Sequence, residues 1–296
     1  PDFSMSGKIL WAYITYCLLN IAYTVVNIPL NTIVPRLTSD NHERNWLVST
    51  RMICALIGTA LVMTITTPLV TFFGQGDTQK GYLITMTIYG IAAVFVFVFT
   101  FMNTKEVVPP TVQPGKSSFK DDFKGLTGPA VIFFILNFLY FGLFVIRNTT
   151  VIYYFTYNLG RTDWLTFVGL FGILSGLPML LLLPWLQKKM PKKNVLLLST
   201  VIYIVGDLVI YFGKSSPVLL IAGLTITGLG IYGIFGTTFA IQPDVIDYSE
   251  YKNSRSIAGM IAAFQGFSVK VSLGLGSALV GVTLKMGGYV PNTTQT

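Results

Sequence analysis

Two basic side chains fall inside apolar stretches that are long enough to cross a lipid bilayer. Arg147 lies in the stretch Ala130–Tyr157, and Lys270 lies 14 residues into the stretch Ile257–Leu284, about 21 Å along a helix. A charge at such a depth costs free energy and by default indicates a functional site. Lys270 is therefore expected to face a polar cavity. The alternative is that each side chain extends along its own helix to the membrane surface.

The composition indicates that membrane-crossing helices position these charges. Hydrophobic residues make up 52% of the chain and charged residues only 11%, against about 25% charged residues in soluble domains. The mean hydropathy is +0.66. The sequence therefore predicts an all-α membrane protein. The predicted spans are Ile9–Leu30, Leu47–Phe73, Tyr82–Met102, Ala130–Tyr157, Trp164–Leu186, Val195–Phe212, Val218–Ile241 and Ile257–Leu284.

The net charge of +8 is distributed unevenly between the predicted spans. Most lysines and arginines lie in alternate connections, and cytoplasmic connections are the ones that collect these residues. These connections are therefore predicted to be cytoplasmic, with both chain ends on the outer side. Because the basicity follows the topology, no nucleic-acid partner is predicted, and the lipid bilayer is the expected surrounding.

Two predicted cytoplasmic connections, Ile28–Arg51 and Gln242–Gly259, share a pattern of charges. Each holds an aspartate and a glutamate three residues apart, followed by basic residues. Carriers built from two related halves repeat such elements, so charge pairs here could close the cytoplasmic side and break during transport. The alternative is a pair of solvated loops. The candidate gate residues are Asp40, Glu43, Arg44, Asp244, Asp247, Glu250, Lys252 and Arg255.

Signatures of catalysis are missing from the sequence. Its one histidine, His42, lies in a predicted cytoplasmic connection, and no GxxxxGK[ST] phosphate-binding loop occurs. Acidic residues flanked by basic ones form ion pairs more often than metal sites. The chain is therefore predicted not to be an enzyme, and no metal site is predicted.

Two long motifs resemble the glycoside–pentoside–hexuronide:cation symporters. The strings NIPLNTIVPRLTSDNHERNWLVSTR and PDVIDYSEYKNSRSIAG, with Lys270 downstream, carry the resemblance. These symporters are sugar carriers of the major facilitator superfamily, typified by the melibiose, glucuronide and xyloside permeases. The resemblance implies a fragment with about eight of twelve transmembrane helices. Residues 1–103 would be the last three helices of the N-terminal bundle, 104–128 a cytoplasmic linker, and 129–296 the first five helices of the C-terminal bundle.

The resemblance also implies where solutes bind, which is between the two bundles. By matched position, the cavity would include Tyr23, Thr24, Asn27, Arg51 and Lys270. Similar carriers place an arginine in the helix of Arg147, whose planar fork suits carboxylates and paired sugar hydroxyls. Sodium-using melibiose carriers have an aspartate at Asn27 and a tryptophan at Asn31, so this chain is more similar to the glucuronide and xyloside branch. Sodium coupling through this helix is accordingly not expected.

The function that this resemblance implies is symport of a sugar with H⁺ or Na⁺ by alternating access. The expected carrier is a monomeric, multi-pass protein of the bacterial cytoplasmic membrane, with no cofactor besides the coupling ion. Two alternatives remain open. The first is a carrier of lipids or other amphiphiles with the same fold, marked by an apolar cavity open to the bilayer. The second is a membrane-embedded enzyme that acts on lipid-linked sugars.

Overall fold

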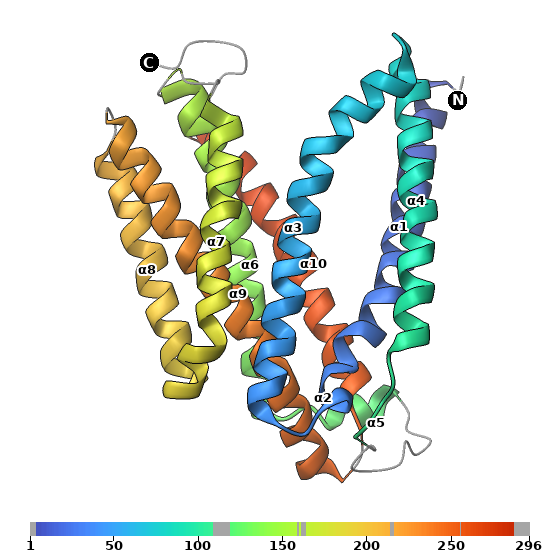
Figure 1. Ribbon diagram of the computed structural model, residues 1–296, viewed down its shortest axis with the longest axis vertical. Coiled ribbons are helices and arrows are strands. Elements are labelled where there is room, and N and C mark those ends of the chain that lie inside the picture. Colours follow the sequence, from blue (N-terminus) through green and yellow to red (C-terminus); the bar gives the residue numbers. More distant parts are fainter. Residues whose placement is uncertain are drawn as a thin grey trace. The chain divides into compact units, whose positions relative to one another are not determined.

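The computed structural model describes residues 4–108, 119–158, 160, 164–213, 216–254 and 256–286. Within these ranges every regular element is helical, and eight helices are long and apolar enough to cross a membrane, as predicted (Figure 1). The elements are α1 (Met5–Thr32), α2 (Val34–Leu37), α3 (Asn41–Gly74), α4 (Thr78–Asn103), α5 (Phe119–Lys124), α6 (Gly128–Tyr153), the π-helical turn η1 (Tyr154–Asn158), α7 (Leu165–Lys189), α8 (Lys192–Phe212), α9 (Pro217–Asn253) and α10 (Ala258–Met286).

The two charged segments predicted as cytoplasmic connections are largely helical where the structure describes them, so the alternative of solvated loops was wrong for these residues. α3 already begins at Asn41, and α9 continues to Asn253, well past the predicted end of its span. The start of α3 has a local cause, because the Asp40 carboxylate accepts a hydrogen bond from the His42 backbone N–H at 2.7 Å. Of the predicted gate residues that the structure describes, Asp40 caps α3 and the others lie on polar extensions of long helices.

The described chain forms two compact units. The first unit consists of Pro1–Ser39, Val108–Asn158 and Ala240–Thr296. Within it α6 and α10 pack closely because small residues face each other. A Cβ atom on Gly276 would lie 3.0 Å from the Gly142 carbonyl oxygen, and glycine at such a position lets two helices approach.

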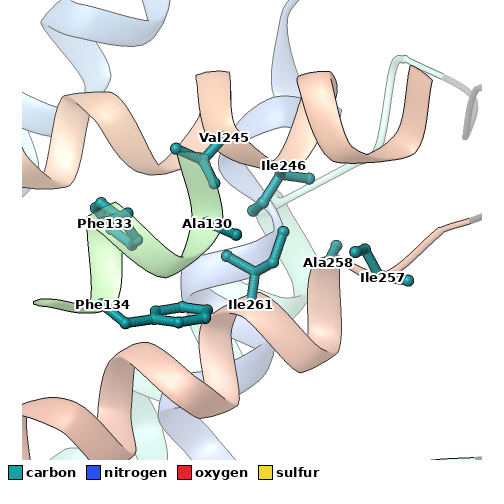
Figure 2. Close-up of a cluster of buried hydrophobic side chains, with 8 residues drawn as sticks. All are labelled: Ala130, Phe133, Phe134, Val245, Ile246, Ile257, Ala258 and Ile261. Atoms are coloured by element: carbon teal, nitrogen blue, oxygen red, sulfur yellow. The ribbon is translucent and has the colours of Figure 1, made fainter. Parts of the chain in front are cut away.

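An apolar cluster joins the end of α9 to α6 and to the start of α10 within the first unit. Figure 2 shows these side chains converging from the three segments. Leu126, which directly precedes α6, also packs against the cluster. The members of the cluster are Ala130, Phe133, Phe134, Val245, Ile246, Ile257, Ala258 and Ile261.

The second unit consists of Asp40–Val107 and Leu159–Phe239, so it contains α3, α4, α7, α8 and the first part of α9. Here the glycine-rich run of α9 permits a close approach of α8. A Cβ atom on Gly230 would lie 2.5 Å from the backbone nitrogen of Tyr203 and 2.6 Å from its Cα. Because the obstructing atoms belong to the backbone, no side-chain rotation could make room for it.

The predicted division into two helical bundles, 1–103 and 129–296, stays a prediction. Each compact unit contains segments from both sides of the predicted linker 104–128. The two units are therefore defined differently from the two predicted bundles. Residues 109–118 of that linker lie outside the described residues. Its last part contains the short helix α5 and ends at α6.

Candidate functional site

One face of α1 and one face of α10 line a cavity of about 530 Å³ in the first unit. The lining residues recur at steps of three and four along each helix, which places them on one side of it. On α1 they are Tyr23, Thr24, Asn27, Ile28 and Asn31. On α10 they include Met260, Ala263, Phe264, Phe267 and Lys270. The wall of α1 is therefore mostly polar, and the wall of α10 is apolar except for one cation.

The Lys270 ammonium lies against α1 and is held by neutral groups. Its Nζ atom donates to the Thr24 Oγ1 at 2.6 Å and to the Asn20 carbonyl oxygen at 3.3 Å. It also lies 5.3 Å from the centroid of the Tyr23 ring, within the range of a cation–π interaction. Among the residues that the structure describes, no carboxylate pairs with this ammonium. A positive charge without a local counter-ion therefore faces the cavity.

The amides of α1 leave hydrogen-bonding groups available to a ligand. Asn27 donates its Nδ2 to the Tyr23 carbonyl oxygen at 3.0 Å, so its side-chain oxygen remains an acceptor. Within the described ranges, the Asn31 amide and the Tyr23 hydroxyl have no hydrogen-bond partner. An amide both donates and accepts, which is what a solute bearing several hydroxyl groups requires.

Two phenylalanines on α10 form the apolar wall in different ways. The Phe264 ring stacks on Phe134 with centroids 5.4 Å apart and lies 5.8 Å from the Phe123 ring, so the apolar core fixes its position. Phe267 is 62% exposed and offers a free ring. A polar wall opposite an apolar wall suits a sugar, because its hydroxyl edge needs hydrogen bonds and its C–H face packs on rings.

Two other residues predicted to line the cavity are not among the residues that line it. Arg147 is half-buried on α6 and donates to the Asn148 Oδ1 at 3.3 Å, and it is not among the residues that line this cavity. Arg51 belongs to the second unit, where its guanidinium lies 5.3 Å from the centroid of the Phe239 ring. The structure thus brings together Tyr23, Thr24, Asn27, Asn31 and Lys270.

The predicted gate residues lie on two helices. Asp40 caps α3, Glu43 lies in its first turn, and Arg44 is buried at 6% exposure; all three belong to the second unit. The acidic members from the other segment lie on the C-terminal extension of α9 in the first unit, followed by the exposed Lys252. These acidic members are Asp244, Asp247 and Glu250. Arg255 lies outside the described residues.

A buried ion pair joins α2 to the end of α9, and only one of its partners was predicted. The Arg36 Nη2 donates to the Glu250 Oε1 at 2.8 Å, with the two side chains 12% and 1% exposed. The Ser256 hydroxyl donates to the same oxygen at 2.7 Å, and the Arg36 carbonyl oxygen accepts from the Val108 N–H at 2.9 Å. Sequence reasoning treated Arg36 as one more topogenic charge. The signal that could have singled it out is its place beside Pro35 in a short helix between two spans.

Further hydrogen bonds anchor the end of the predicted linker to the end of α9. The hydroxyls of Thr127 and Ser249 lie 2.9 Å apart, and the Asn253 Nδ2 donates to the Gly125 carbonyl oxygen at 2.7 Å. Together with the apolar cluster of Figure 2, these bonds hold the extension that carries Glu250 in a fixed position.

Membrane-crossing helices with a cavity that is lined by amides, aromatic rings and a half-buried cation are the architecture of a membrane transport protein. A family model described as MFS/sugar transport protein matches residues 1–296, and the chain belongs to this family.

The chain is also similar to individual transport proteins. The chain is 35% identical over 303 residues to the isoprimeverose transporter of Lactiplantibacillus pentosus. This alignment covers 100% of the chain and 63% of that protein. It is 32% identical over 295 residues to the putative glycoside/cation symporter YagG of Escherichia coli K12, with 98% and 63% covered. It is 28% identical over 297 residues to the inner membrane symporter YicJ of the same strain, with 98% and 63% covered. The chain thus spans slightly less than two thirds of these relatives.

These matches confirm the predicted glycoside–pentoside–hexuronide:cation symporter family and the predicted class of fold. The chain is a multi-pass membrane protein of a transport family and not an enzyme, and the inner membrane symporter among its relatives agrees with the predicted location. The names of the relatives refer to different solutes, or to glycosides in general. Family membership therefore leaves the solute of this chain undetermined.

Proposed function

We propose that this chain forms the solute-binding part of a carrier that moves a glycoside, pentoside or hexuronide together with H⁺ or Na⁺. The observation that supports this most directly is the cavity between α1 and α10, with polar and apolar walls and the Lys270 ammonium. The matched relatives named as an isoprimeverose transporter and a putative glycoside/cation symporter support the class of solute.

In this proposal the two walls contact different parts of the sugar. The amides of Asn27 and Asn31 bond to hydroxyl groups, and the exposed Phe267 ring packs on the C–H face. Lys270 binds a hydroxyl or carboxylate oxygen in exchange for its present contact with Thr24. Arg51 remains part of the proposed site through the family resemblance alone.

Transport further requires that the cavity opens to each side in turn. We place the Arg36–Glu250 ion pair at the centre of the cytoplasmic gate, because it joins the segment after α1 to the end of α9. Asp40, Glu43, Arg44, Asp244, Asp247 and Lys252 are the further proposed gate residues. In the cycle proposed here, the ion pair breaks when the cytoplasmic side opens and re-forms when it closes.

The coupling ion in this proposal is bound mainly outside the described cavity. No carboxylate lines the cavity among the described residues, since Asn27 is an amide, and Na⁺ sites in proteins need several oxygen ligands. The choice between H⁺ and Na⁺ is therefore made elsewhere in the carrier.

The test of the proposed function is uptake by the intact carrier in proteoliposomes with an imposed H⁺ or Na⁺ gradient. Lys270→Ala should reduce accumulation of a uronide roughly tenfold to a hundredfold, because the lost hydrogen bond joins two charged groups. The matched control is Lys285→Ala, which removes an exposed lysine from the last turn of the same helix and should leave accumulation unchanged. Normal accumulation by the Lys270→Ala carrier would overturn the site.

The apolar wall of α10 is the observation that favours the alternative of an amphiphile carrier. Met260, Ala263 and Phe264 could contact an alkyl chain as well as a sugar ring. A panel of free glycosides and their long-chain alkyl derivatives separates the two functions. Gradient-driven accumulation of the free glycosides supports sugar transport, and accumulation of the alkyl derivatives alone supports the amphiphile carrier.

A further inference from the structure

The turn between α7 and α8 concentrates positive charge at the end of two membrane-crossing helices. The segment reads KKMPKK from Lys188 to Lys193, and no acidic residue occurs between Trp164 and Ile204. α7 ends at Lys189 and α8 begins at Lys192, so all four lysines lie within one short turn. Lys188, Lys189 and Lys193 are exposed, and Lys192 is half-buried.

Three lysines of this turn, Lys188, Lys189 and Lys193, form no ion pair among the described residues. The Lys189 Nζ lies over the Trp185 ring, 3.8 Å from its centroid, which is a cation–π contact and leaves the positive charge in place. In the part of the chain that the structure describes, Lys188 and Lys193 have no ionic partner. The first turn of α8 also contains no acidic residue, although the helix dipole favours carboxylates there. Lys188, Lys189 and Lys193 therefore form a positive patch to which no described carboxylate is paired.

The surroundings of the patch match the boundary between hydrocarbon and headgroups. Trp185 is 51% exposed, and tryptophan is enriched at this boundary. Leu181 and Leu182 on α7 are 56% and 53% exposed, and Leu197 on α8 is 54% exposed. Exposed apolar surface on both helices thus directly adjoins the lysines.

We propose that this turn binds the phosphate group of an anionic phospholipid in the cytoplasmic leaflet. The cytoplasmic side follows from the distribution of lysine and arginine between the connections. A lipid fits better than a soluble anion, because the exposed leucines give its acyl chains a surface beside the charged patch. Clusters of basic residues just beyond a span are a known feature of anionic lipid recognition.

Lysines in a loop also help to keep that loop on the cytoplasmic side, and this effect differs from the proposed lipid binding. Retention of positive loops on the cytoplasmic side needs charge but no defined geometry. The stacking of Lys189 on Trp185 holds one ammonium beside the ring, which is a defined geometry that retention of the loop does not require. The proposal therefore predicts a preference for anionic headgroups that depends on this turn and not on cytoplasmic charge in general.

The experiment uses the intact carrier in mixed micelles and measures retention of phosphatidylglycerol against phosphatidylcholine by native mass spectrometry. In the triple variant Lys188→Gln/Lys189→Gln/Lys193→Gln the preference for phosphatidylglycerol should fall by about fivefold for each lysine removed. The matched control is Lys105→Gln/Lys120→Gln/Lys124→Gln, which removes the same charge from another predicted cytoplasmic connection. This control should keep the preference.

A second readout locates the bound lipid. In a carrier whose other tryptophans, Trp11, Trp46 and Trp164, are changed to phenylalanine, brominated phosphatidylglycerol should quench Trp185 more strongly than brominated phosphatidylcholine does. Equal loss of preference in both triple variants, or no loss in either, overturns the proposal. Displacement of the lipid by millimolar inorganic phosphate overturns it in favour of a soluble anion.

Discussion

Removal of Arg36 should destabilise the carrier far more than the position of this residue in a short helix suggests. Arg36 supplies the ionic partner of Glu250, whose side chain is 1% exposed. The only other bond to the Glu250 Oε1 in the described structure comes from the Ser256 hydroxyl at 2.7 Å, and the Oε2 is buried without a partner there. The variant Arg36→Met keeps an unbranched side chain but leaves the carboxylate without a cation.

The expected magnitude follows from the burial of the pair. A buried ion pair that loses one partner destabilises a protein by about 3–5 kcal/mol, whereas replacement of both partners by neutral groups is often close to neutral. Arg36 is 12% exposed, so Glu250→Gln should cost less, about 1–2 kcal/mol, because the guanidinium keeps access to water. The double variant Arg36→Met/Glu250→Gln should be more stable than Arg36→Met alone, with a coupling energy of about 2 kcal/mol or more.

The assay is a double-mutant cycle of unfolding free energies, measured as reversible unfolding of the intact carrier in mixed micelles of dodecyl maltoside and SDS. The control is Lys252→Met, which removes an exposed charge from the same end of α9 and should change stability little. Additive effects of the two single substitutions, within about 0.5 kcal/mol, would refute this account of the pair.

Three further predictions concern the cavity and the packing of the helices. Thr24→Val should strengthen solute binding in an equilibrium binding assay while Thr24→Ser leaves it unchanged, because the Thr24 hydroxyl competes with the solute for the Lys270 ammonium. Gly230→Ala should destabilise the carrier by about 1–3 kcal/mol in the same unfolding assay, since a Cβ would collide with the backbone of Tyr203, whereas Gly90→Ala, with open space around its Cβ, should not. Asn27→Asp should add Na⁺ dependence to uptake at constant pH; an unchanged ion dependence would count against a role of this position in coupling.

The membrane spans and the depth of Lys270 could be predicted from local properties of the sequence, whereas the α1 residues of the cavity followed only from the family resemblance. Span length and apolarity are additive along the chain, and a basic or amide side chain within a span is conspicuous. The apolar wall of α10 was not predicted, since Met260, Phe264 and Phe267 are ordinary residues of a span. Their spacing from Lys270, at three, six and ten residues, places them on the same face and could have identified this wall.

The contacts of Arg36 and Arg147 could not be predicted from neighbouring residues in the sequence. The partner of Arg36 is 214 residues away in the chain, so the ion pair exists only through the tertiary fold. For Arg147 the depth within a span could be predicted, but the direction of the side chain depends on how α6 is rotated. That rotation is set by close packing against α10 at Gly142 and Gly276, and it places the guanidinium beside Asn148 and away from the lining of the cavity.

The hydrogen-bond partners of Lys270 also bear on which solutes the proposed carrier would select. Its ammonium already bonds to the Thr24 hydroxyl and the Asn20 carbonyl oxygen, so a neutral sugar hydroxyl would replace a bond of similar strength and gain little from this residue. A carboxylate would gain more, because a hydrogen bond between two charged groups is about twice as strong as one between neutral groups. Under the proposed function, Asn27 and Asn31 therefore supply the affinity for hydroxyls that all sugars share, and Lys270 favours uronides over neutral glycosides.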